Sequence, residues 1–160
     1  QNDDTGATQA LAQALRLEPT LAEEPVLRSM IRDLVGTSSN ELASLLKELG
    51  EAPDRAWLPL LTELAQTARR FSERRQAWEV LETLGEFGTL EPFAYLSDQL
   101  ERNLSKKCSI RAWYVRRLIA LQDRRVMAIA AEEQTRPRRQ RACMDEDLAA
   151  VLAQNTPPEE

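Results

Sequence analysis

The 160-residue sequence contains no histidine, five glycines and two cysteines. The absence of histidine removes the commonest general base, the Ser-His and Cys-His catalytic dyads and the commonest zinc ligand. Two cysteines are too few for a four-thiolate metal site. Few glycines disfavour a turn-rich β-sheet protein, and no apolar run approaches the roughly 20 residues of a membrane-spanning helix. We therefore expect a protein that is not an enzyme, needs no cofactor or metal, and has no membrane span.

Sequence motifs of nucleotide and acyl-transfer chemistry are missing as well. Residues 85–88 (Gly-Glu-Phe-Gly) are too short for a phosphate-binding loop and lack its lysine, and no Gly-x-Ser-x-Gly occurs. Glu79, Glu82 and Glu86 share one helical face, which could bind a metal or serve acid–base chemistry. Because no second matching motif accompanies them, we interpret them as a solvated face. A small enzyme that uses carboxylates alone is the alternative.

Good helix formers dominate the composition, chiefly Leu, Ala, Glu, Arg and Gln. Apolar residues recur at helical spacing, and proline or glycine separates most of these stretches. In one stretch, for example, Val26, Met30 and Ile31 belong to a double apolar stripe typical of an amphipathic helix. The sequence predicts an all-α protein of eight or nine helices, with short linkers and antiparallel neighbours. The candidate helices are 5–17, 25–35, 39–49, 53–68, 72–84, 90–104, 109–121, 126–134 and 145–154.

The order of these segments predicts the domain organisation. We expect a helical-repeat domain over 5–134, followed by an Arg-rich linker and a short C-terminal helix over 135–154. Residues 1–4 and 155–160 are expected to be disordered ends.

An Ala-Trp dipeptide recurs three times, each time near the front of an amphipathic segment. The three pairs are Ala56-Trp57, Ala77-Trp78 and Ala112-Trp113. Residues 75–80 also align with 110–115 at an offset of 35 residues. Recurrence at this spacing favours stacked helix pairs. We expect the three indoles to lie in the core, since each stands on an apolar stripe.

Segments 72–104 and 109–134 resemble HEAT-type repeats, a family of α-solenoids. In the second segment Arg111-Ala112 lies early in the first helix, Asp123 lies at the turn, and Val126 opens the second helix. The resemblance implies antiparallel helix pairs stacked as a short, irregular HEAT-like solenoid. It also implies a scaffold or protein-binding surface, which is the main role of such families. An irregular all-helical domain with the same packing is the alternative.

Cys108 and Cys143 are the two cysteines, 35 residues apart in the sequence. In an oxidising compartment they would form one disulfide bond. The alternatives are two unrelated core residues or a redox-sensing pair whose thiols are activated by neighbouring cations. The disulfide and the start at Gln1 together favour a periplasmic or secreted protein over a cytoplasmic one. That start could follow a cleaved signal peptide or reflect a boundary within a longer chain.

Charge is unevenly distributed along the chain. Residues 1–101 hold 9 basic and 18 acidic side chains, whereas residues 102–141 hold 12 basic and 3 acidic ones. Acidic helices and residues 145–147 could neutralise the basic segment within the fold. Alternatively, the segment is an anion-binding face for an acidic patch on a protein, with nucleic acid unlikely in an acidic chain. The best candidates for polar contacts are Arg111, Arg116, Arg117, Arg124 and Arg125.

These patterns predict a non-enzymatic helical-repeat adaptor or scaffold that binds another protein. The alternative is an inhibitor or immunity-type protein, which would neutralise a basic partner enzyme through the acidic face of residues 63–101.

Overall fold

The computed structural model describes residues 3–37, 39–103 and 107–153, and every regular element in these ranges is helical. The all-α prediction is therefore confirmed. Two short 3-10 helices, η1 (Pro19–Glu23) and η2 (Arg55–Trp57), accompany the α-helices. The α-helices are α1 (Asp3–Leu17), α2 (Pro25–Thr37), α3 (Ser39–Glu51), α4 (Leu58–Thr67), α5 (Phe71–Leu84), α6 (Pro92–Arg102), α7 (Cys108–Ala120), α8 (Val126–Thr135), α9 (Arg138–Arg141) and α10 (Asp145–Ala153).

Each segment predicted to be helical overlaps one of these α-helices, and α9 is additional. It is a four-residue helix inside the stretch 135–141 that the sequence predicts as a linker. At the ends, α1 begins at Asp3, within the segment 1–4 expected to be disordered. The expected disordered tail 155–160 lies outside the described residues.

The start of α4 shows how the chain accommodates Pro59 inside an apolar helical stretch. The Asp54 carboxylate accepts a hydrogen bond from the backbone N–H of Ala56 at 2.8 Å, which caps η2 rather than a longer α-helix. The α-helix begins only at Leu58, so Pro59 falls in its first turn, where no intrahelical N–H is required. The pair Ala56-Trp57 thus precedes its helix, whereas Ala77-Trp78 and Ala112-Trp113 lie inside α5 and α7.

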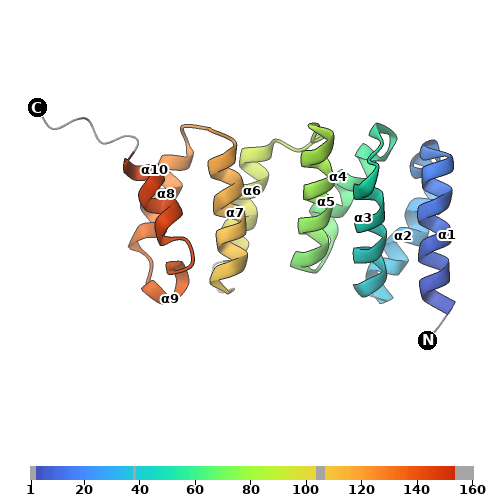
Figure 1. Ribbon diagram of the computed structural model, residues 1–160, viewed down its shortest axis with the longest axis horizontal. Helices are drawn as coiled ribbons and strands as arrows, with labels where there is room; N and C mark the ends of the chain where they lie inside the picture. Colours follow the sequence, from blue (N-terminus) through green and yellow to red (C-terminus); the bar gives the residue numbers. More distant parts are fainter. Residues whose placement is uncertain (1–2, 38, 104–106, 154–160) are drawn as a thin grey trace, which may run out of the picture. The chain divides into compact units, whose positions relative to one another are not determined.

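The described chain divides into two compact units, Gln1–Leu90 and Glu91–Glu160. In the first unit, α3 lies between α1 and α5 and contacts both, while α2 packs on α3 and α4 packs on α5 (Figure 1). This position explains why four leucines of α3 are completely buried: Leu42, Leu45, Leu46 and Leu49. At the far end of α5, Gly85 adopts the left-handed conformation and ends the helix.

In the second unit, α6 packs on α7, and α8 packs on α10. Helix α7 also contacts α8 and α9, so it connects the two helix pairs. Its buried residues include Tyr114, Val115 and Leu118, and Leu96 of α6 and Leu148 of α10 are buried as well. No helix within the three described ranges has the length and apolar character that crossing a bilayer requires.

The tryptophans differ in burial, although all three were expected in the core. Trp57 and Trp78 of the first unit are fully buried. Trp113 of the second unit is only partly buried, and the Arg117 guanidinium lies 5.0 Å from the centre of its ring. Trp113 is therefore a boundary residue, with a cation over one face of its ring.

Candidate functional site

The first predicted contact residue, Arg111, belongs to the core. Its side chain is 0% exposed, and its Nη2 donates to the Glu133 carboxylate of α8, which is 2% exposed. A surface partner cannot reach this guanidinium in the folded unit. Arg111 instead connects α7 to α8, so it is a structural residue and not part of a contact surface.

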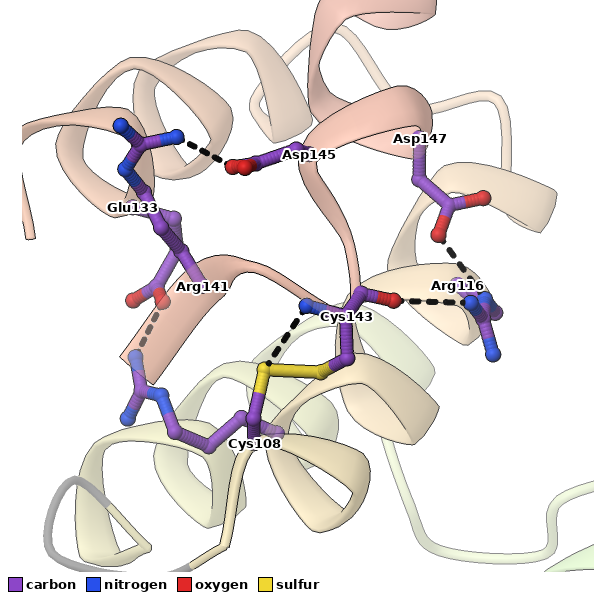
Figure 2. The surroundings of a disulfide bond; sticks show 8 residues. Cys108, Arg116, Glu133, Arg141, Cys143, Asp145 and Asp147 are labelled. Atoms are coloured by element: carbon purple, nitrogen blue, oxygen red, sulfur yellow. Dashed lines mark hydrogen bonds and ion pairs between the residues drawn. A yellow bond between two sulfur atoms is a disulfide. The ribbon is translucent and has the colours of Figure 1, made fainter. Parts of the chain in front are cut away.

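Arg116 is exposed but already engaged within the second unit. Its Nε donates to Asp147 of α10 at 2.9 Å, and its Nη2 donates to the carbonyl of Cys143 at 3.1 Å (Figure 2). The side chain thereby joins α7 to the segment that precedes α10. The sequence left open whether residues 145–147 neutralise the basic segment or whether it binds a partner, and Asp147 neutralises Arg116 in the structure.

Arg125 makes the densest set of contacts among the five predicted arginines. Its guanidinium donates to both carboxylate oxygens of Asp123, pairs with Glu91 at 3.2 Å, and lies 3.9 Å from the centre of the Phe93 ring. Arg124 beside it is exposed and makes no ion pair among the described residues. Four of the five predicted arginines therefore have an intramolecular contact, counting Arg117 on its indole.

The contacts of Arg125 change the acidity of its neighbour. Hydrogen bonds from the Arg125 side chain, and then from its backbone N–H, lower the pKa of Asp123 to about 2 from its ordinary 3.8. Because the folded-state pKa is depressed, the stabilisation is present above the unfolded pKa of about 4 and is lost as the pH falls through about 2.

An NMR titration of the Asp123 side-chain carboxyl should therefore give a midpoint near 2. In Arg125→Gln the midpoint should rise toward 3.8, because the main hydrogen-bond donor is lost. Arg124→Gln is the matched control and should leave the midpoint unchanged. An unchanged midpoint in Arg125→Gln would show that another group holds the carboxylate.

Cys108 and Cys143 form a disulfide bond that joins the first residue of α7 to the segment between α9 and α10 (Figure 2). The disulfide bond predicted from the sequence is therefore confirmed. Around the bond, the backbone N–H of Cys143 donates to the Cys108 sulfur at 3.2 Å. Arg141 of α9 pairs with Asp145 at the start of α10. The bond and these contacts together fix the connection between α9 and α10.

Removing the disulfide should destabilise the second unit. In the chain-entropy model a closed loop of this length contributes about 3–4 kcal/mol. We expect Cys108→Ser/Cys143→Ser to lower the free energy of unfolding in urea by about this amount. Wild-type protein unfolded in the presence of reductant is the control and should match the variant. Equal urea midpoints for oxidised wild type and variant would contradict the expectation.

Much of the remaining basic segment is also neutralised inside the second unit. Arg136 pairs with Glu132 and Glu133 of α8, each at 2.7 Å. Lys106 lies outside the described residues. Exposed cations without an ion pair among the described residues remain at Lys107, Arg124, Arg138 and Arg139. Ion pairs within the second unit therefore neutralise most of the arginines of the basic segment. The predicted anion-binding face is left with few cations available to a partner.

The acidic face of α5 is occupied in a similar way. Glu79 pairs with Arg75 at 2.8 Å, and Glu82 accepts a hydrogen bond from the indole N–H of Trp78 at 2.7 Å. Glu86, just after the helix, pairs with Arg55 at 2.6 Å. Each of these carboxylates thus has a structural partner in the first unit.

A surface that the sequence analysis did not identify lies on the outer side of α2. Val26 is 72% exposed and Met30 is 54% exposed, although both belong to the apolar stripe of this helix. Leu17, at the end of α1, is 79% exposed. These three are the large apolar side chains that are exposed in the described part of the chain. We call the exposed surface formed by Val26 and Met30 the α2 face.

The orientation of α2 is fixed from its inner side. Ile31 is completely buried, and Arg28 donates to Glu63 of α4 at 2.5 Å. Successive residues of an α-helix are separated by about 100°. Val26 and Met30 therefore lie on the side away from Arg28, next to the buried stripe. The apolar stripe of α2 is wider than the surface of the first unit that covers it.

A groove of about 550 Å³ lies along α4, with Arg28 of α2 in its wall. It is lined by Arg28, Leu58, Pro59, Thr62, Glu63, Gln66, Gly88 and Thr89. The ion pair of Arg28 with Glu63 occupies its charged wall, and the buried Thr62 lies against Gly88. The two charged residues of the groove are therefore paired with each other.

Comparisons with protein-family models, with curated proteins and with solved structures gave no match. Function is therefore inferred from the surface of the described residues.

Proposed function

We propose that this chain is a non-enzymatic helical adaptor that binds another protein. The observation that carries the proposal is the α2 face, where Val26 and Met30 are largely exposed on a helix whose other side is anchored in the core. Large apolar side chains that share one exposed helix face mark interaction sites more often than isolated ones do. The neighbouring packing of α1, α3 and α5 supports a HEAT-like stack in the first unit, a type of architecture that serves mainly as a scaffold.

The predicted arginine surface is the weaker candidate for the contact. Arg111 is buried, and Arg116 and Arg125 already bind carboxylates of their own unit. Binding an acidic patch through them would first require those ion pairs to break. The α2 face has no such cost, because Val26 and Met30 are already exposed to water and gain free energy when covered.

We also propose an oxidising compartment, periplasmic or extracellular. The disulfide between Cys108 and Cys143 supports this location, since such bonds form and persist where thiols are not kept reduced.

An inhibitor or immunity-type protein is the second candidate function. It is favoured by the exposed carboxylates of Glu23 and Glu24, which immediately precede α2, in addition to the acidic face of residues 63–101 expected from the sequence. Such groups would complement a basic enzyme surface.

The test of adaptor function is capture from native extract with the disulfide intact, followed by mass spectrometry. Val26→Ser/Met30→Ser should lose the partner that wild type retains, because the apolar contact area is removed. The matched control is Ala149→Ser/Ala153→Ser, which places the same polar groups one turn apart on exposed positions of α10. Both changes are at the surface, so thermal unfolding should stay close to wild type. A partner retained equally by both variants would exclude the α2 face.

A further inference from the structure

We propose that the α2 face binds an amphipathic helix whose apolar side is flanked by lysine or arginine. This inference rests on the proposed function and adds the chemistry of the partner. Three observations carry it: the spacing of the two apolar side chains, the charges around them, and the repulsion that a second copy of α2 would meet.

The spacing of Val26 and Met30 suits a helical partner. Residues four apart lie one above the other on a helix and form a ridge along its surface. Such a ridge packs into the groove between the side-chain rows of a second helix. The buried Ile31 and the bond from Arg28 to Glu63 hold α2 in place, so the ridge is presented without rearrangement of the first unit.

The charges around the ridge are acidic at both ends. Glu23 and Glu24 immediately precede α2. Both are exposed, and they make no ion pair among the described residues. Asp33, also exposed, lies three residues beyond Met30 on the same side of the helix. A partner helix that covers the ridge would place its flanking residues beside these carboxylates, which favours lysine or arginine there.

The same charges disfavour a second copy of this chain as the occupant. In a symmetric antiparallel pair of α2 helices, Glu23 and Glu24 of one copy would approach Asp33 of the other. Carboxylates would then lie close to carboxylates beside the shared ridge, and such contacts are repulsive. A basic helix meets an attractive rim instead, so we assign the face to a different protein.

The experiment uses the full-length oxidised chain and a panel of fluorescein-labelled helical peptides. Each peptide carries leucine, isoleucine or phenylalanine anchors one turn apart, flanked by lysine, and has a twin in which glutamate replaces the lysine. Fluorescence anisotropy should show binding of lysine-flanked peptides, weakened by added salt, and no binding of their twins.

The variants separate the apolar and the charged contributions. Val26→Ser/Met30→Ser should abolish binding, and Glu23→Gln/Glu24→Gln should weaken it about three- to tenfold through loss of rim charges. Ala149→Ser/Ala153→Ser should bind like wild type. Equal binding of the twins, or affinity independent of Val26 and Met30, would overturn the inference.

The remaining outcomes distinguish this inference from the proposed function. Sedimentation of the chain alone should show a monomer, whereas a dimer that Val26→Ser/Met30→Ser dissolves would make a second copy the occupant and overturn the inference. If extract capture depends on Val26 and Met30 but no lysine-flanked peptide binds or competes, the adaptor function stands and the basic helix is wrong. If capture is also independent of these residues, both fail.

Discussion

Replacing Glu133 by alanine is expected to lower the free energy of unfolding of the second unit by about 3–5 kcal/mol. The change leaves the Arg111 guanidinium, which is 0% exposed, without its carboxylate. Its Nε and Nη1 are also buried and donate to no protein atom among the described residues. An uncompensated charge of this kind cannot recover its hydration without opening the unit. Urea unfolding, read with amide hydrogen exchange to localise the loss to α7 and α8, measures the effect.

Two further variants separate the charge effect from the loss of side-chain volume. Glu132→Ala, on the exposed side of the same helix, removes a surface ion pair with Arg136 and should cost less than about 1 kcal/mol. Replacing both members of the buried pair, as Arg111→Met/Glu133→Leu, should restore most of the stability, because no buried charge remains. A double variant as unstable as Glu133→Ala would show that packing, and not the orphaned guanidinium, causes the loss.

Trp78→Ala is expected to lower the free energy of unfolding of the first unit by about 3–5 kcal/mol. The Trp78 side chain is completely buried, and its ring centre lies 4.7 Å from that of Phe87. Its removal opens a large cavity and also takes the indole donor from Glu82. Urea unfolding followed by far-ultraviolet circular dichroism measures the change without relying on the deleted fluorophore.

The matched substitution is Trp113→Ala at the aligned position of α7. Trp113 is partly buried, and one face of its ring lies under the Arg117 guanidinium. Less apolar area is lost there, so this variant should be clearly less destabilised than Trp78→Ala. Equal destabilisation would mean that the environments of the two indoles are more similar than their burial indicates.

The helices could be predicted from the sequence because their signals are local. Gly85, in the left-handed conformation, ends α5, and Pro92 lies in the first turn of α6. Pro59 conflicts with a continuous helix over residues 53–68. The structure resolves this conflict by starting α4 after the separate 3-10 helix η2. The short α9 had no apolar stripe to indicate it, since it consists of Arg-Arg-Gln-Arg.

The candidate site was harder to predict, because exposure depends on which elements meet. Val26, Met30 and Ile31 belong to one stripe in the sequence, and only the packing of α2 decides that Ile31 is covered and the others are not. Similarly, Arg111 and Arg116 look alike as basic residues of one helix. Their different roles follow from Glu133 and Asp147, which come from distant parts of the chain. The width of the α2 stripe was the one signal that could have indicated an unfilled side.

The disulfide closes a covalent ring that contains α7, α8 and α9. A protease such as trypsin that cuts once within this ring, for example at the exposed Arg138 or Arg139, produces two fragments that stay joined through sulfur. Nicked and intact chains would then migrate together on a non-reducing gel and separate only after reduction. A single cleavage within the ring is therefore detected on a gel only after the disulfide is reduced.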